Sequence, residues 1–329
     1  MNPTLTLEEI YTPVDADLKR VPQMILDILA TPNELAGDVI NYFFSGRGKL
    51  LRPALTLLGA QIKGATPSSE ELLRLAASFE IFHAATLIHD DIIDSAYLRR
   101  NLPTVNAKWN SQVAVLVGDY LHDKAMGTIF QAASADIFSL FLETAGVVCD
   151  GEIHELNEKG NFHLTEDEYI QIVDKKTAVL LSCCVEAGGR FSGVPDEEAA
   201  ALSRFGRLFG IAFQIADDCL DFTGNEHEFG KTLGADIAAG VLTLPLIRVL
   251  EVSSASKRQQ IIEVFKSADK REKFQELLHL IRENGAIDYS LEQARGYSQK
   301  AQAELEIFPD SQARQSLQKL LDYVLERNK

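Results

Sequence analysis

Two acidic motifs of the same form stand 127 positions apart in this chain of 329 residues. The first runs Asp90-Asp91-Ile92-Ile93-Asp94, and the second runs Asp217-Asp218-Cys219-Leu220-Asp221. Each follows an apolar run with helical spacing, and residues four apart lie on one helix face. Carboxylates crowded in apolar surroundings need a compensating cation. Since Mg²⁺ commonly joins one or two carboxylates to substrate phosphates, the two motifs predict a diphosphate held through magnesium.

Basic residues close to glycines could bind the phosphates directly. The segment Gly46–Pro53 combines two glycines with Lys49 and Arg52. Glycine lets the backbone approach a ligand, and lysine and arginine bind phosphate through charge and hydrogen bonds. Taken alone, such a segment is typical of an ordinary helix start. Three further basic segments are candidates for the same role: Arg99-Arg100, Lys175-Lys176-Thr177 and Gly230-Lys231.

The elements that carry these residues are predicted to be helices. Long stretches without proline, such as those between Pro103 and Pro195, have apolar residues at helical spacing. Thr165 with Glu168 three residues later forms a capping box, and Pro195 followed by acidic residues opens another helix. Because no sustained alternating segment or Asn-Gly turn occurs, the predicted fold class is all-α.

Composition narrows the class of protein. A formal charge of −16 argues against a nucleic-acid partner, which usually meets a basic surface. The four cysteines lie in apolar helical runs without zinc-ligand spacing, so we expect core residues. No apolar run reaches the roughly 18 residues that span a bilayer, and no signal peptide is evident. We therefore expect a cytoplasmic protein without stable membrane insertion. No linker divides the chain, and residues 1–329 are predicted to form one domain.

Taken in order, the motifs resemble those of the trans-prenyl (polyprenyl) diphosphate synthase family. One such motif is weak, whereas the ordered set across roughly residues 45–250 is specific. The matching segments are Gly48–Pro53, His83–Asp94, Leu98–Arg100, Gly118–Leu121, Gly151-Glu152, Lys176–Ala178, Phe213–Asp221, Gly230-Lys231 and Thr243–Leu246. The resemblance implies a single large helical bundle around a central cavity, the isoprenoid synthase fold, and a homodimer.

The resemblance also implies a Mg²⁺-dependent, head-to-tail condensation of isopentenyl diphosphate with an allylic diphosphate. About three Mg²⁺ ions per active site would be bound by carboxylates. The implied metal ligands are Asp90, Asp94, Asp217 and Asp221, the last of them through water. The implied isopentenyl diphosphate site is Lys49, Arg52, His83 and Arg100. The implied allylic site is Arg99, Lys176 and Lys231, with Thr177 and Gln214 at the reacting centre and Asp217 counted among the catalytic residues. Asp91 and Asp218 point away from the ligand face and are expected to be hydrogen-bonded or salt-bridged.

Product length depends on the helix before the first acidic motif. Ala85 and Thr86 lie one turn before Asp90, where members of the family with bulky aromatics make short products. Small residues favour a long product, and we expect roughly seven to ten isoprene units. Phe82, deeper on the same helix, or Phe130, on a neighbouring one, could close the tunnel. Because apolar residues usually pack in the core, both could also be ordinary core residues.

Two positions depart from the family pattern. Asn101-Leu102 stands where Gly-Lys is common, and Val241 replaces a lysine that normally contacts the allylic diphosphate. Losing one charged phosphate contact costs about 1.5–3 kcal/mol. Other cations could compensate for it, or the affinity could be weaker.

Three alternatives remain from the sequence. The first is a synthase of farnesyl or geranylgeranyl length, with Phe82 as the floor. The second is a class I terpene cyclase, which would replace the second aspartate motif and would not need Lys49 and Arg52. The third is a catalytically silent partner subunit, which would usually have lost one of the two motifs. Both motifs are present, which favours the elongating synthase.

Overall fold

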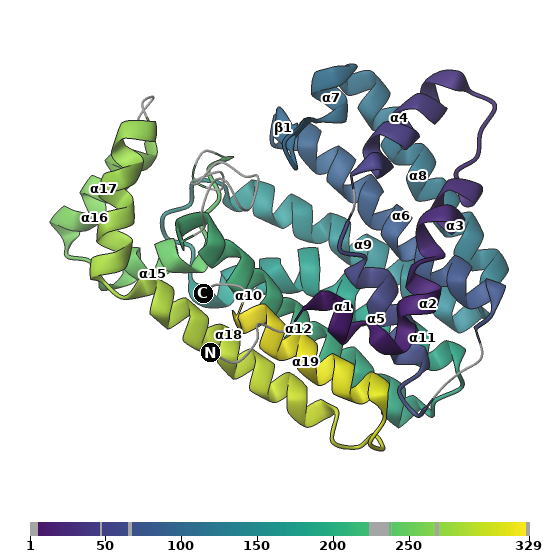
Figure 1. Cartoon of the computed structure of the whole chain (residues 1–329). Helices are drawn as coiled ribbons and strands as arrows, with labels where there is room; N and C mark the ends of the chain where they lie inside the picture. The colour runs from purple at the N-terminus through teal and green to yellow at the C-terminus, as the bar shows by residue number, and fades with distance from the viewer. Residues whose placement is uncertain are drawn as a thin grey trace. The chain divides into compact units, whose positions relative to one another are not determined.

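The computed structural model describes residues 6–46, 48–64, 68–223, 237, 239–266 and 270–326. Its contacts divide the chain into two compact units. Unit 1 comprises Met1–Thr144, Leu181–Gly206 and Glu304–Leu320, and unit 2 comprises Ala145–Leu180, Arg207–Ala303 and Leu321–Lys329. Both units are built almost entirely of helices (Figure 1), so the all-α prediction is confirmed. The prediction of one domain over residues 1–329 stays a prediction.

Helices and one small hairpin form unit 1. Its elements are α1 (Leu7–Ile10), a 3₁₀ turn (Thr12–Val14), α2 (Asp15–Leu18), α3 (Val21–Ile28), α4 (Glu34–Ser45), α5 (Leu51–Ala60), α6 (Glu70–Ile93), β1 (Leu98–Arg99), β2 (Leu102–Pro103), α7 (Val105–Lys108) and α8 (Ser111–Ala132). Strands β1 and β2 pair antiparallel, with Leu98 opposite Pro103 and Arg99 opposite Leu102.

Unit 2 is also helical. Its elements are α10 (Glu166–Val173), a π-helical segment (Asp174–Ala178), α15 (Leu244–Val252), α16 (Ala255–Lys266) and α17 (Lys270–Glu283). The boundary between the units falls inside five helices, α9 (Ala135–Glu158), α11 (Val179–Phe191), α12 (Asp196–Thr223), α18 (Ala286–Glu304) and α19 (Gln312–Glu326). The predicted capping box begins α10: Thr165 Oγ1 accepts the Glu168 amide at 3.3 Å, and Glu168 Oε2 accepts the Thr165 amide at 2.8 Å.

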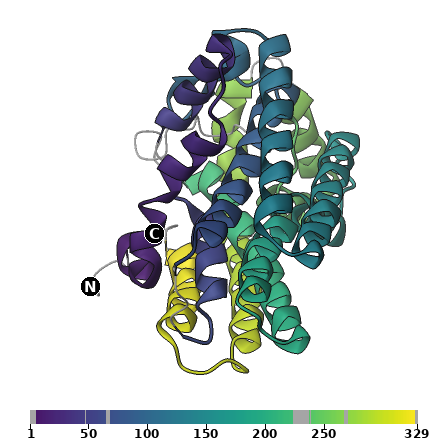
Figure 2. The same cartoon turned by 90° about the vertical axis from the view of Figure 1, so that its right-hand side faces the viewer.

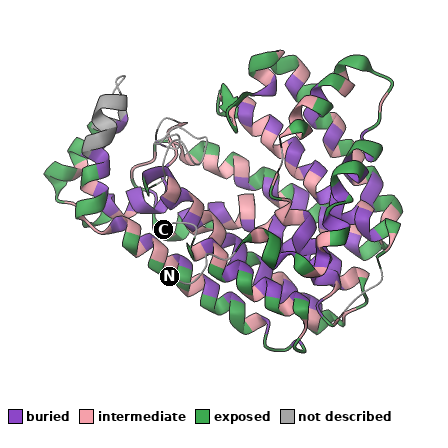
Figure 3. Cartoon of the chain, viewed as in Figure 1, coloured by how far each residue is buried: buried purple, intermediate pink, exposed green. Residues whose placement is uncertain are grey.

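Helix α6 is the centre of unit 1. It lies along α8, with α3 and α5 packed against it (Figures 1 and 2). Buried side chains occur all round its circumference, including Phe79 and Phe82, which is the pattern of a core helix. Helix α5 is buried over most of its length (Figure 3). Ser69 caps the start of α6 by accepting the Leu72 amide at 3.1 Å. The first acidic motif is thereby attached to a rigid element.

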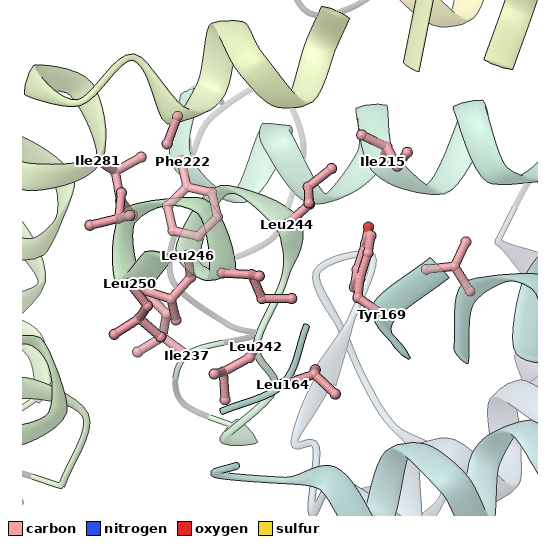
Figure 4. Packing of buried hydrophobic residues seen from close by; sticks show 14 of the residues in the cluster. Leu164, Tyr169, Ile215, Phe222, Ile237, Leu242, Leu244, Leu246, Leu250 and Ile281 are labelled. Carbon is pink, nitrogen blue, oxygen red and sulfur yellow. The ribbon is translucent and has the colours of Figure 1, made fainter. Parts of the chain in front are cut away.

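Unit 2 has a separate apolar core. Leu164 and Tyr169, from the α10 region, pack with Ile215 and Phe222 of α12 and with residues of α15 (Figure 4). Leu244, Leu246 and Leu250 supply most of the α15 contribution. This packing holds the end of α12, which carries the second acidic motif, against α10. None of the helices over the described ranges is long and apolar enough to cross a membrane.

Candidate active site

Both acidic motifs lie at the carboxyl end of a long helix. Helix α6 ends at Ile93, so Asp90 stands in its last turn and Asp94 follows as the capping residue. Helix α12 ends at Thr223, with Asp217 and Asp221 in its last two turns. Carboxylates are unfavourable there because the helix dipole is negative at that end. Each helix end therefore presents negative charge that a bound cation would stabilise.

Asp91, the second aspartate of the first motif, forms an ion pair with the hairpin. Its carboxylate accepts from Arg99 Nε at 2.9 and 3.1 Å and from Arg99 Nη2 at 2.9 Å. Asp91 is buried, and burial raises the pKa of its carboxyl while the Arg99 hydrogen bonds oppose that rise. The expectation that Asp91 is salt-bridged is confirmed. Arg99, assigned from sequence to the allylic diphosphate, is held by this pair.

The hairpin turn explains one departure from the family pattern. Arg100 and Asn101, which connect the two strands, have φ values of +52° and +62°. Two-residue hairpin loops often need positive φ at both positions, which glycine and asparagine adopt most readily. Asn101 can therefore replace glycine in this turn without changing its shape. Arg100 adopts the same conformation without that advantage, and such backbone strain is typical of functional positions.

Basic side chains from two stretches of unit 1, the start of α5 and the hairpin, lie within electrostatic reach of His83. Burial, and then the charges of Arg52, Arg99 and Arg100, hold the pKa of His83 well below its usual value. The imidazole is therefore neutral among three guanidinium groups. Burial also lowers the pKa of Arg52, whereas Lys49 is exposed in the preceding loop. A cluster of this kind suits an anion with several charges.

Asp218, the middle aspartate of the second motif, is hydrogen-bonded to neutral side chains rather than to an arginine. Asp218 is buried and accepts from the Tyr169 hydroxyl at 2.6 Å and from Gln214 Nε2 at 2.7 Å. Gln214 Oε1 accepts in turn from Thr177 Oγ1 at 3.0 Å. Burial raises the pKa of Asp218 to about 7. The network shows Asp218 hydrogen-bonded, as expected, and it brings together the predicted residues Thr177 and Gln214.

Lys176 and Thr177 stand in the π-helical segment between α10 and α11. Such wide turns are rare and frequent at functional sites. Lys176 Nζ lies 2.8 Å from Glu152 Oε2 and 2.5 Å from Glu155 Oε2, both on α9. Gly151 permits this approach, because a Cβ there would lie 2.8 Å from the Lys176 backbone nitrogen. The predicted phosphate ligand Lys176 is thus held beside two carboxylates.

Sequence reasoning missed several residues of this chemistry. Glu152 and Glu155 were not recognised as partners of Lys176, although their spacing places both on one face of α9. Tyr169 was not recognised either, since it stands 49 positions from Asp218 and only the fold joins them. The predicted phosphate ligand Lys231 lies outside the described residues. Val241, which replaces the usual lysine of the family, is half-buried just before α15.

The residues proposed to set product length differ in placement. Ala85 is buried and Thr86 is half-buried on α6, so neither blocks the space below Asp90 with a large side chain. Phe82 is buried, with ring centroids 5.1 Å from Phe141 and 5.5 Å from His122. Phe130 is 68% exposed. Only Phe82 of the two phenylalanines lies in the interior of the described structure, so the exposure of Phe130 does not support it as a floor.

The carboxylates fit a divalent cation of the hard type. Aspartate oxygens are the ligands that Mg²⁺ prefers. Over the residues that the structure describes, no group of three histidine, cysteine, aspartate or glutamate side chains forms a ready-made metal cluster. Beside one or two carboxylates, Mg²⁺ keeps water and takes substrate phosphate oxygens as further ligands. The residues therefore fit a metal that arrives with its diphosphate.

Comparisons with known proteins agree with this chemistry. The polyprenyl synthetase family model matches residues 33–281. The chain is 32% identical over 324 residues to the octaprenyl diphosphate synthase of Haemophilus influenzae, covering 98% of each protein. It is 33% identical over 313 residues to a short chain isoprenyl diphosphate synthase of Methanothermobacter thermautotrophicus, covering 94% of each.

A solved structure extends the similarity to three dimensions. The polyprenyl synthase of Caulobacter crescentus, complexed with calcium and isoprenyl diphosphate, has a TM-score of 0.93 and 30% identity, covering 100% of both chains. Prenyl diphosphate synthases depend on a divalent metal. The chain belongs to the polyprenyl synthetase family and is a trans-prenyltransferase with the all-α isoprenoid synthase fold.

Proposed function

We propose that this enzyme extends an allylic diphosphate with isopentenyl diphosphate to make a long, linear trans-polyprenyl diphosphate. The observation that carries the proposal is the group of Arg52, Arg99 and Arg100 around a neutral His83, on the same unit as the acidic end of α6. A terpene cyclase has no need of this second diphosphate site. The octaprenyl diphosphate synthase similarity also supports a synthase.

The proposed roles follow the chemistry of the side chains. Lys49, Arg52, His83 and Arg100 bind the diphosphate of isopentenyl diphosphate, which stays attached throughout. Lys176, Arg99 and Lys231 bind the allylic diphosphate. Asp90, Asp94, Asp217 and Asp221 would hold Mg²⁺, which when bound would stabilise the charge of the departing diphosphate. We propose about three such ions, a number that metal titration of the enzyme with an unreactive diphosphate would test.

The reaction breaks one bond and forms another. The allylic C–O bond opens, and the alkene of isopentenyl diphosphate attacks the resulting carbocation. A proton then leaves to the released diphosphate. Thr177 and Gln214 are proposed to line the reacting carbon, and their hydrogen bond to each other fixes both side chains. Water must be kept from the cation, which it would quench.

Small residues at Ala85 and Thr86 support a long product, for which the tunnel must pass beside the Phe82–Phe141 ring pair. A floor at this pair would give the shorter product instead. From the Phe82 Cα to the Asp90 Cα the rise along α6 is ~12 Å, so the tunnel must continue past α6 if the product is to be long. Replacing Ala85 with phenylalanine should shorten the product. The same products from Ala85→Phe and wild type would remove Ala85 from this role.

One experiment tests the function as a whole. The purified protein is incubated with Mg²⁺, isopentenyl diphosphate and farnesyl diphosphate, and the dephosphorylated products are separated by chromatography. Linear chains of seven to ten units are expected, that is, roughly the length that an open tunnel allows. Geranylgeranyl-length products would favour the shorter synthase, cyclic hydrocarbons a cyclase, and no turnover a silent partner subunit.

We further propose that the enzyme is a homodimer that pairs through α8. Leu116 and Phe130 are each 68% exposed, and about four turns separate them, which places both on one face. Gly127 lies on that face too, with open space above it. A stable dimer buries about 800 Å² per partner.

The oligomeric state can be measured directly. Leu116→Glu with Phe130→Glu should give a monomer in sedimentation velocity. Leu35→Glu, at an exposed leucine on α4, serves as the control and should leave the mass unchanged. An unchanged dimer in the double variant would place the interface elsewhere. The cytoplasmic location stays a prediction.

A further inference from the structure

Glu80 is a half-buried acid that none of the proposed roles uses. It lies on α6, one turn before His83. Its Oε2 is buried and, among the described residues, accepts no hydrogen bond. A carboxylate in this position costs several kcal/mol unless opposite charge stands nearby. The Glu80 carboxylate therefore requires a compensating positive charge.

Opposite charge does stand nearby, and it comes from the proposed isopentenyl diphosphate site. Burial raises the pKa of Glu80, and the positive charges of Arg52 and Arg100 oppose that rise. Glu80 Oε1 lies 3.4 Å from the point where a Cβ on Gly48 would stand, and Arg100 Nη1 lies 3.6 Å from the same point. Glu80 and Arg100 thus both lie beside the glycine of the basic loop.

The geometry is close but incomplete. Arg52 Nε is buried and, among the described residues, has no hydrogen-bond partner. Cys184 of α11 also lies within electrostatic reach, and burial raises its pKa well above the usual value, so that it is neutral. Among the described residues, Glu80 is therefore the acid whose charge acts on both Arg52 and Arg100.

We propose that Glu80 is a positioning residue for isopentenyl diphosphate. Without substrate, its charge offsets the mutual repulsion of Arg52 and Arg100 and holds both guanidinium groups in place. Their unused donors then remain available to the incoming diphosphate. Since this rests on the proposed binding role of Arg52 and Arg100, the test must separate the two proposals.

The principal variant is Glu80→Gln, which keeps the shape of the side chain and removes its charge. We expect the KM for isopentenyl diphosphate to rise at least tenfold, with the KM for the allylic substrate within twofold and kcat within threefold of wild type. A purely structural role would instead lower the thermal midpoint and change both KM values together, which would overturn the proposal. Glu71→Gln, at an exposed acid in the first turn of α6, is the matched control and should leave all three constants unchanged.

Two more variants complete the test. Glu80→Asp retains the charge on a shorter side chain. Its log KM for isopentenyl diphosphate should lie at least halfway back from that of Glu80→Gln to wild type. A KM equal to that of Glu80→Gln would overturn the role of charge. Arg52→Ala examines the underlying site. An unchanged KM for isopentenyl diphosphate in Arg52→Ala would remove the binding site and the Glu80 proposal with it. A raised KM there with an unchanged KM in Glu80→Gln would overturn the Glu80 proposal alone.

Discussion

The acidic ends of α6 in unit 1 and α12 in unit 2 share a motif but hold its middle aspartate in opposite ways. Asp91 pairs with the guanidinium group of Arg99, which is about one-third exposed. Asp218 is buried against neutral donors, the hydroxyl of Tyr169 and the amide of Gln214. The first arrangement keeps a carboxylate ionised by an opposite charge. The second leaves its carboxyl with a pKa of about 7, because hydrogen bonds from neutral groups offset only part of the burial cost.

The difference shows what each middle aspartate connects. In unit 1, Asp91 joins the end of α6 to the hairpin that carries Arg100. In unit 2, Asp218 fastens the helix end to Gln214 and through it to Thr177 in the π-helical segment. A repeated sequence motif therefore supports a charged site in one unit and a network of uncharged polar groups in the other.

The largest effect on activity should come from the first aspartate of each motif, for which we propose the same metal-binding role in both units. Asp90→Ala and Asp217→Ala should each lower kcat by at least about 10³-fold, since each removes a ligand from the metal that stabilises the leaving diphosphate. Product formation at saturating Mg²⁺ measures this, and a chelator should abolish the wild-type reaction. A loss in only one variant would mean that the two acidic ends are not equivalent even in their ligand residues. Intact condensation in the double variant would refute the metal role of both.

Substituting the two middle aspartates, Asp91 and Asp218, should give different losses in the free energy of unfolding. Asp91→Asn leaves Arg99 without its counterion, and because that arginine is partly exposed we expect a loss of about 2 kcal/mol in the free energy of unfolding. In Asp218→Asn, the amide of Gln214 can turn over, so that its oxygen accepts from the new amide and its nitrogen donates to Thr177 Oγ1. We expect less than about 1 kcal/mol there. Urea unfolding of the metal-free protein measures both, and equal losses would break the comparison.

Unit 2 has Val241 where the family usually has lysine. Introducing a lysine there should change the KM for the allylic diphosphate only. Val241→Lys adds a charged phosphate contact worth about 1.5–3 kcal/mol, so the KM for the allylic diphosphate should fall about tenfold or more. The KM for isopentenyl diphosphate should stay within twofold. Steady-state kinetics with each substrate varied in turn gives both values. Unchanged allylic KM would indicate that other cations already fill this role.

Local signals made much of the fold predictable. Apolar spacing and the Thr165–Glu168 capping box are encoded within a few residues, and the structure has helices where these signals predicted them. The aspartate spacing likewise predicted that Asp91 and Asp218 are hydrogen-bonded or salt-bridged, and both are. The partner Tyr169 could not be predicted for Asp218, because the two residues are distant in sequence and only folding joins them.

Two backbone features, the hairpin and the π-helical segment, could not be predicted from the sequence either. The hairpin around Arg100 and Asn101 has two-residue strands and no Asn-Gly turn, so its positive φ values leave little trace in the pattern. The π-helical segment at Lys176 depends on contacts with α9, which helical periodicity does not report. Glu80 resembles any other helical acid until its burial near two arginines is known.

The smallest effect should come from the outer end of the unit 2 network. Tyr169→Phe removes one donor to Asp218 and keeps the ring in the core beside Leu164 and Ile215. We expect a loss of about 1 kcal/mol in unfolding free energy and a fall in kcat of no more than about threefold, because Gln214 still donates to Asp218 and still positions Thr177. Combining it with Gln214→Ala in a double-mutant cycle sharpens the comparison. Additive losses would mean that Tyr169 and Gln214 act on Asp218 independently, whereas a coupling of about 0.5 kcal/mol or more would show that the uncharged network works as a unit.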